Sequence, residues 1–149
     1  MIVSGYLTEN IKLTKLHDHT AAGTTDVTDC VTVDMAGYDG ALFFTSFSVA
    51  AADNSLKLQQ SSDDGSSDAY SDLEGSGVVS GASPSYEDVW LDITNPGKRY
   101  LKPVVVVDTS STVESVWCIQ YRARSLPITN TVSGTIIGEQ TNAPAEGTA

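Results

Sequence analysis

The sequence predicts an all-β fold, an antiparallel β-sandwich that is followed by an extended C-terminal arm. Three observations predict it. Apolar and polar residues alternate with a period of two over several short segments, which is the pattern of half-buried strands. Turn residues separate roughly seven such segments. Charged residues make up only 18% of the 149 residues, and neutral polar residues replace them, as is typical of turn-rich β proteins.

The first half of the chain contains four expected strands. Residues 41–49 form the most apolar of them, with Phe43 and Phe47 on one face and Leu42 and Phe44 on the other. A strand that is apolar on both faces is usually central in its sheet or covered by a second element. The shorter candidates lie at residues 11–16, 30–34 and 55–60.

The second half contributes three more expected strands, at residues 89–93, 100–107 and 113–122. Asn95-Pro96-Gly97 forms a turn before the second of them, with Pro and Gly at the positions that a type II turn requires. Pro103 cannot donate a ladder hydrogen bond, so it predicts an edge strand or a bulge. The last segment places one set of apolar residues on a single face: Val113, Trp117, Ile119 and Tyr121.

The apolar faces of these strands predict one shared core. A chain of this length buries roughly 68–70% of its unfolded surface without help from disulfides or metals. In a reducing compartment, Cys30 and Cys118 are expected to be free thiols that act as small apolar fillers, and only their even number supports the alternative of a disulfide between them. The expected core residues are Leu42, Phe43, Phe44, Phe47, Leu56, Leu58, Trp90, Leu91, Val105, Trp117 and Ile119.

Two parts of the chain are expected, a sandwich body at residues 1–126 and an extended arm at residues 127–149. Within the body, residues 61–85 are rich in Ser, Asp and Gly and predict a polar surface excursion, with a short helical stretch at residues 68–74. The arm has too few apolar residues for a core of its own. Either it orders against a neighbouring subunit, by adding a strand or draping over a surface, or it is a disordered terminus.

Composition and charge exclude several classes of function. The 19 acidic and 8 basic residues give a net charge of −11, which argues against a nucleic-acid partner and against an anionic membrane surface. The sequence contains no run of 18 apolar residues, so no membrane span is predicted. The first residues lack a basic region followed by an apolar run, so no signal peptide is expected and synthesis in a cytoplasm follows.

Few residues suggest catalysis or metal binding. His17 and His19 share one side of a strand, as half of a zinc site would, but they are the only histidines and a solvated loop explains them better. A Gly-x-Ser-x-Gly motif is absent. Residues 63–68 resemble a calcium loop superficially, yet they lack its alternating spacing and read better as a turn. We expect no enzyme activity, no cofactor and no metal.

Five of the eight basic residues fall in one third of the chain: Lys98, Arg99, Lys102, Arg122 and Arg124. If the strands near Lys102 and Arg122 pair, these side chains form one cationic edge. Such an edge either balances the charge of the acidic excursion or docks an acidic partner surface.

Several segments resemble a family of small structural proteins of tailed bacteriophages. The turn Val33-Asp34-Met35-Ala36-Gly37-Tyr38-Asp39-Gly40 leads into an apolar strand, as it does in that family. Ser55-Leu56-Lys57-Leu58-Gln59-Gln60-Ser61 resembles the family's next strand and turn. The Arg99-Tyr100-Leu101-Lys102-Pro103 segment and the strand at 113–121 resemble later ones. The resemblance runs in order from about Thr32 to Pro127.

This resemblance implies a head decoration (cement) protein with a sandwich or jelly-roll fold. Such a protein binds the outer surface of the capsid and stabilises contacts between capsid subunits. The implied partners are the major capsid protein and copies of the chain itself, as a homotrimer or homodimer. The implied location is the capsid surface of the virion, reached after assembly in the host cytoplasm.

The distribution of residues nominates the contacts. We expect three sets of contact residues: apolar anchors on the arm, residues of the N-terminal segment that lie along a neighbouring subunit, and two arginines that pair with acidic groups. In that order, the candidates are Ile128, Val132, Ile136 and Ile137; Ile2, Val3 and Tyr6; and Arg122 and Arg124.

Two alternatives remain open. A structural protein of the phage neck or tail would use the same fold and arm. A carbohydrate-binding β-sandwich module is the other alternative, and it would use exposed aromatic side chains as its platform. The candidates for that platform are Tyr70, Tyr86 and Trp90.

Overall fold

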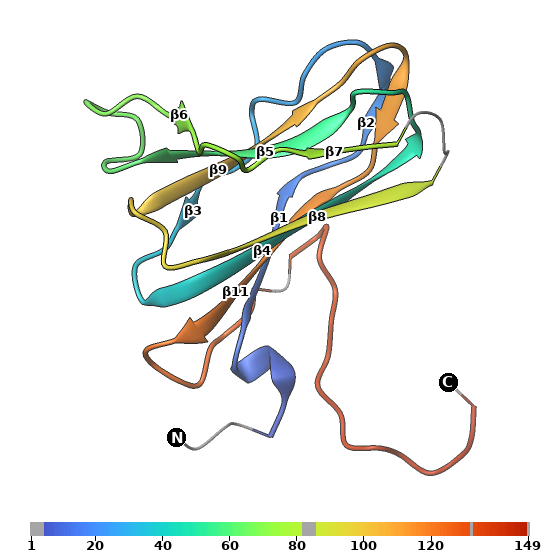
Figure 1. Ribbon diagram of the computed structural model, residues 1–149. Coiled ribbons are helices and arrows are strands. Elements are labelled where there is room, and N and C mark those ends of the chain that lie inside the picture. Colours follow the sequence, from blue (N-terminus) through green and yellow to red (C-terminus); the bar gives the residue numbers. More distant parts are fainter. Residues whose placement is uncertain (1–4, 82–85, 132, 149) are drawn as a thin grey trace.

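The computed structural model describes residues 5–81, 86–131 and 133–148, which form two antiparallel sheets facing each other (Figure 1). A short 3-10 helix, η1 (Leu7–Glu9), precedes the strands. In chain order the strands are β1 (Lys12–His17), β2 (Thr20–Gly23), β3 (Val33–Asp34), β4 (Tyr38–Val49), β5 (Ser55–Ser61), β6 (Ser71–Asp72), β7 (Val78–Val79), β8 (Glu87–Thr94), β9 (Tyr100–Val106), β10 (Ser111–Val113) and β11 (Val116–Ala123).

The first sheet is built around β4. Strands β10 and β11 follow each other along one side of β4, and β8 pairs with its other side. Strand β1 pairs with β11, and β2 pairs with β10. We therefore treat β1 and β2 as one long interrupted strand, and β10 and β11 as another. The sheet is therefore four strands wide, in the order β1/β2, β10/β11, β4 and β8.

The second sheet has the order β3, β9, β5 and then β6 with β7, which both pair with the far side of β5. A bridge between Val27 and Val105 extends the track of β3 along β9. When the interrupted strands are merged, the first sheet contains strands one, eight, three and six of the chain. The second contains strands two, seven, four and five, and this arrangement is that of a jelly roll. The predicted fold class is confirmed.

The core lies between the two sheets. Phe43, Phe47, Leu56, Leu58 and Val105 are fully buried there, as the sequence predicts. Leu91 is partly buried and packs against the same cluster. Both cysteines are free and buried, as expected. Burial raises the pKa of each thiol to about 12, so both stay protonated and unreactive at neutral pH.

Five expected core residues lie elsewhere. Leu42, Phe44, Trp117 and Ile119 are half-buried on the outer face of the first sheet, and Trp90 on β8 is 64% exposed there. The inward face of β11 carries Val116, Cys118 and Gln120 instead. Alternation in sequence separates two faces but does not say which one points inward. Gln120 fits inside because its amide donates to the backbone oxygen of Asp34 at 2.8 Å.

Two local predictions are also wrong. Residues 68–74 contain no helix; β6 forms there, and β6 and β7 make part of the excursion an edge of the second sheet. Pro103 lies in a central strand without a bulge, paired with Leu58. On the other side of β9, the pairs described are β3 with Tyr100 and Leu101, and Val27 with Val105. Pro103 falls in the gap between these pairs, where no donor is required.

Candidate interaction surface

The arm begins by docking on the N-terminal segment of its own chain. The side-chain amide of Asn130 donates to the backbone oxygens of Thr8 (2.6 Å) and Ile11 (3.0 Å), and its Oδ1 accepts from the backbone N–H of Leu13 (2.7 Å). The N–H of Ile128 donates to the backbone oxygen of Glu9 at 2.7 Å. Asn130 therefore satisfies an amide at the open edge of β1, which is where an unpaired strand most needs a partner.

Further along, the arm makes a small turn and then touches the N-terminal segment at two more places. Ser133 and Ile136 form an isolated bridge, and Lys15 donates to the backbone oxygen of Thr135 at 3.4 Å. Gln140 donates to Thr8, and Tyr6 donates to Asn142. A cavity of about 430 Å³ lies between the two segments, lined by Leu13, Ile128 and Ile136 among others. In Figure 1 the arm continues past η1 and away from the sheets.

The structure brings together most of the nominated contact residues that it describes. Tyr6, Ile128 and Ile136 all contribute to the junction between arm and N-terminal segment. Ile137 lines the same cavity but is 89% exposed, so most of its side chain has nothing to pack against within this chain. Ile2, Val3 and Val132 lie outside the described residues.

The basic residues do not form one cationic edge. Lys102 lies on β9 and Arg122 on β11, which belong to different sheets. Three of the five pair with aspartates of the same chain: Lys98 with Asp68 (2.6 Å), Arg99 with Asp34 (2.7 Å) and Arg124 with Asp39 (2.8 Å). Lys102 lies over the ring of Tyr70. Arg122 is exposed, and no acidic residue of the described chain pairs with it.

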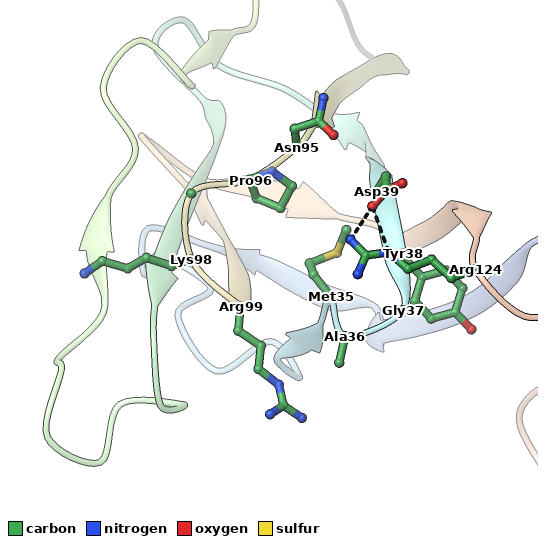
Figure 2. A pocket seen from close by; sticks show the side chains of 11 residues that line it. Met35, Ala36, Gly37, Tyr38, Asp39, Asn95, Pro96, Lys98, Arg99 and Arg124 are labelled. Atoms are coloured by element: carbon green, nitrogen blue, oxygen red, sulfur yellow. Dashed lines mark hydrogen bonds and ion pairs between the residues drawn. The ribbon is translucent and has the colours of Figure 1, made fainter.

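Three of these basic residues, Lys98, Arg99 and Arg124, line a shallow pocket of about 360 Å³, formed by the turn before β4 and the turn before β9. Figure 2 shows Arg124 directed toward Asp39, while the side chains of Lys98 and Arg99 extend away in other directions. Their charges do not converge on the pocket, and each is neutralised by its own aspartate. The arrangement stabilises the two turns and offers no concentrated charge to a ligand.

The polar loop at residues 61–70 is ordered by its own side chains. The carboxylate of Asp63 accepts hydrogen bonds from the backbone N–H groups of Ser67 and Asp68. The carboxylate of Asp68 accepts from Ser62 and from Lys98, and these contacts lower the pKa of Asp68 to about 2. Among the described residues, no group of three or more His, Cys, Asp or Glu side chains is placed to hold a metal ion.

This loop makes acid stability depend on Asp68. Because its folded pKa lies near 2 and an unfolded aspartate titrates near 3.9, the stabilisation is complete above about pH 4 and is lost as the pH falls toward 2. We expect Asp68→Asn to lower the urea midpoint at pH 7, and the difference from the original chain to shrink between pH 4 and 2. The matched control is Asp53→Asn, an exposed turn residue with no hydrogen-bond partner among those described. A difference that stays constant down to pH 2 contradicts this role.

The two histidines pair with separate carboxylates. His17 lies 3.1 Å from Asp29, and His19 lies 3.2 Å from Glu114. Glu114 is held ionised by Ser48 and His19, which lower its pKa. One ring therefore links β1 to the loop before β3, and the other links the β1–β2 connection to the β10–β11 connection.

The aromatic outer face of the first sheet was missed by sequence reasoning. Register places Trp117, Phe44 and Trp90 in one row across β11, β4 and β8. Four residues further along β11, the ring of Tyr121 lies over Gly40, where a Cβ would come within 2.2 Å of it, and the Tyr121 hydroxyl donates to Asp92 (2.6 Å). The sequence of β8 contains the signal that could have revealed this face. Its aliphatic residues Val89, Leu91 and Ile93 alternate with Asp88, Trp90 and Asp92, which places Trp90 on the same outward side as the two aspartates.

The residues of the expected carbohydrate platform do not assemble. Tyr70 donates to Asp64 in the polar loop and is covered by Lys102 of the second sheet. Trp90 faces outward from the first sheet. Tyr86, which is 81% exposed, precedes β8 and lies nearer to Trp90 in the chain. The three aromatic side chains therefore do not form one surface.

Comparison with known proteins leaves the site to be interpreted from its own geometry. No protein family, curated protein or solved structure matches this chain. Over the described residues, no helix is both long and apolar enough to cross a membrane.

Proposed function

We propose that this chain is a non-enzymatic decoration (cement) protein of a tailed-bacteriophage head. It binds the outer surface of the capsid and stabilises contacts between capsid subunits. Its partners are the major capsid protein and further copies of itself, as a homotrimer or homodimer. Two features support the proposal: the ordered series of phage-like segments from Thr32 to Pro127, and the jelly roll, an architecture common among viral capsid domains and lectins. Because one fold serves many functions, the argument depends on the arm.

The arm is the observation that carries the proposal. Residues 137–148 are exposed throughout, and Ile137 presents 89% of its surface to solvent. The core cluster contains no arm residue, so the sandwich does not need the arm for its packing. Beyond Asn130 the arm is held only by a few exposed hydrogen bonds, from Lys15, Gln140 and Tyr6, and a segment attached so lightly is suited to reach a neighbouring subunit.

The candidate contacts also share one end of the sandwich. The N-terminal segment, the start of the arm and Arg122 all lie where β1 begins and β11 ends. This end faces the capsid in the proposed complex. Binding there adds buried area across subunit junctions, and it stabilises the assembled shell because the protein binds the assembled state and not free subunits. An arm that engages a second subunit strengthens attachment through a high effective concentration.

The decisive experiment counts this chain in purified virus particles by quantitative mass spectrometry against the major capsid protein. We expect hundreds of copies in a simple ratio to the capsid subunit, because decoration sites repeat with capsid symmetry. About a dozen copies would assign the chain to the neck or tail. Its absence from particles would refute a structural role in the virion.

A further inference from the structure

Strand β8 is an open edge of the first sheet. All eight of its residues pair with β4 in unbroken register, from Glu87 opposite Phe47 to Thr94 opposite Gly40. On its other side, no strand of the described chain pairs with it, and no backbone hydrogen bond reaches it. Such an edge presents a row of N–H and C=O groups that can pair with another chain.

The other sheet edges are short or interrupted, whereas β8 is long and regular, and β5 and β7 of the facing sheet lie near it without pairing with it. The β1 edge is interrupted between Lys15 and His17 and is capped by Asn130. Strands β3, β6 and β7 are only two residues long each. By contrast, β8 has eight residues with no proline, no lysine and no irregularity. Natural proteins keep such edges short, irregular, charged or covered, and of these devices β8 has only the charges of Glu87, Asp88 and Asp92.

The side chains at this edge indicate the chemistry of that partner. Trp90, 64% exposed, lies between Asp88 and Asp92 on the outer face. These two carboxylates accept hydrogen bonds from the hydroxyls of Ser46 and Tyr121, and no cationic side chain of the described residues pairs with them. Elsewhere on the body, Asp34, Asp39 and Asp68 each pair with a lysine or an arginine, whereas Asp88 and Asp92 do not.

We propose that the β8 edge binds an extended, basic segment of a partner protein as an added strand. The segment pairs its backbone with β8 and carries Lys or Arg at alternate positions. One cation stacks on the indole of Trp90 and its neighbours meet Asp88 and Asp92. A second copy of this chain fits poorly, because pairing β8 with β8 would place acidic side chains of the two copies opposite each other. The inference goes beyond the proposed function, since any protein with such a segment would satisfy it.

The test uses the full chain and a labelled peptide of alternating valine and arginine, as long as β8. We expect saturable binding by fluorescence anisotropy at one peptide per chain, with NMR shifts concentrated on β8 amides. Trp90→Ala should weaken binding roughly 2- to 30-fold. Asp88→Asn combined with Asp92→Asn should weaken it about tenfold. The matched control, Glu139→Gln with Glu146→Gln, removes the same charge from the exposed arm and should leave binding unchanged.

Backbone pairing is tested separately with two peptides that are N-methylated on alternate amides. Only one edge of the peptide faces β8, so one methylation pattern should abolish binding and the other should preserve it. Equal binding of both patterns, or equal losses in the β8 and arm variants, would overturn the proposal in favour of non-specific charge attraction. Equal binding of a valine–glutamate peptide would overturn it as well. If the chain alone forms dimers in which the β8 amides are protected from hydrogen exchange, the occupant of the edge is a second copy of this chain, and the proposal of a basic partner is overturned.

Discussion

Replacing Phe43 by alanine is expected to lower the free energy of unfolding by about 3–5 kcal/mol, a large part of the stability of a domain this size. Phe43 is fully buried between the sheets and belongs to the central strand β4. Its removal leaves a cavity lined by residues of both sheets, which cannot collapse without disturbing the register of β4 with β8 and β11. Urea unfolding followed by circular dichroism measures the loss.

The neighbouring Phe44 provides the matched comparison. It points to the outer face and is half-buried, so Phe44→Ala should cost about 1–2 kcal/mol. Trp117→Ala should likewise cost less than Phe43→Ala, although sequence reasoning alone places Trp117 in the core. If Phe44→Ala proves as damaging as Phe43→Ala over a range of protein concentrations, the assignment of inner and outer faces is wrong.

Removal of residues 128–149 is expected to leave a folded body that no longer binds particles. No arm residue belongs to the core cluster, so the sandwich keeps its packing. The deletion does expose the β1 edge, because the contacts of Asn130 with Thr8, Ile11 and Leu13 disappear. Occupancy on particles that lack this protein, measured by mass spectrometry after mixing, should fall by at least about tenfold.

A second variant keeps this prediction testable if the shortened chain proves unstable. Ile137→Asp changes a side chain that is already 89% exposed, so it should not alter folding. It should nevertheless weaken particle binding, because a buried apolar anchor would become a buried charge. Asn130→Ala separates the two roles of the arm, since it releases the attachment to β1 and keeps the apolar residues. Full occupancy with both Ile137→Asp and the deletion would show that the body alone binds the capsid.

The candidate surfaces could be predicted only in part. The arm and the basic residues are visible in the sequence because their composition departs from that of the body. Their partners are not visible: Lys98 pairs with Asp68 thirty residues away, and Asn130 caps a strand near the other end of the chain. The open edge at β8 also depends on pairing, because a strand becomes an edge only when no other strand lies beside it.

The amino-acid pattern is enough to specify a β-sandwich, the approximate positions of most of its strands, and the segment that extends beyond the body. These properties follow from local patterns, period-two alternation and turn residues, which act within a few neighbouring positions. Tertiary structure alone decided the jelly-roll order of the strands and the inward face of β11. Alternation treats its two faces equally, and only packing against the second sheet selects Cys118 and Gln120 for the interior while leaving Trp117 outside.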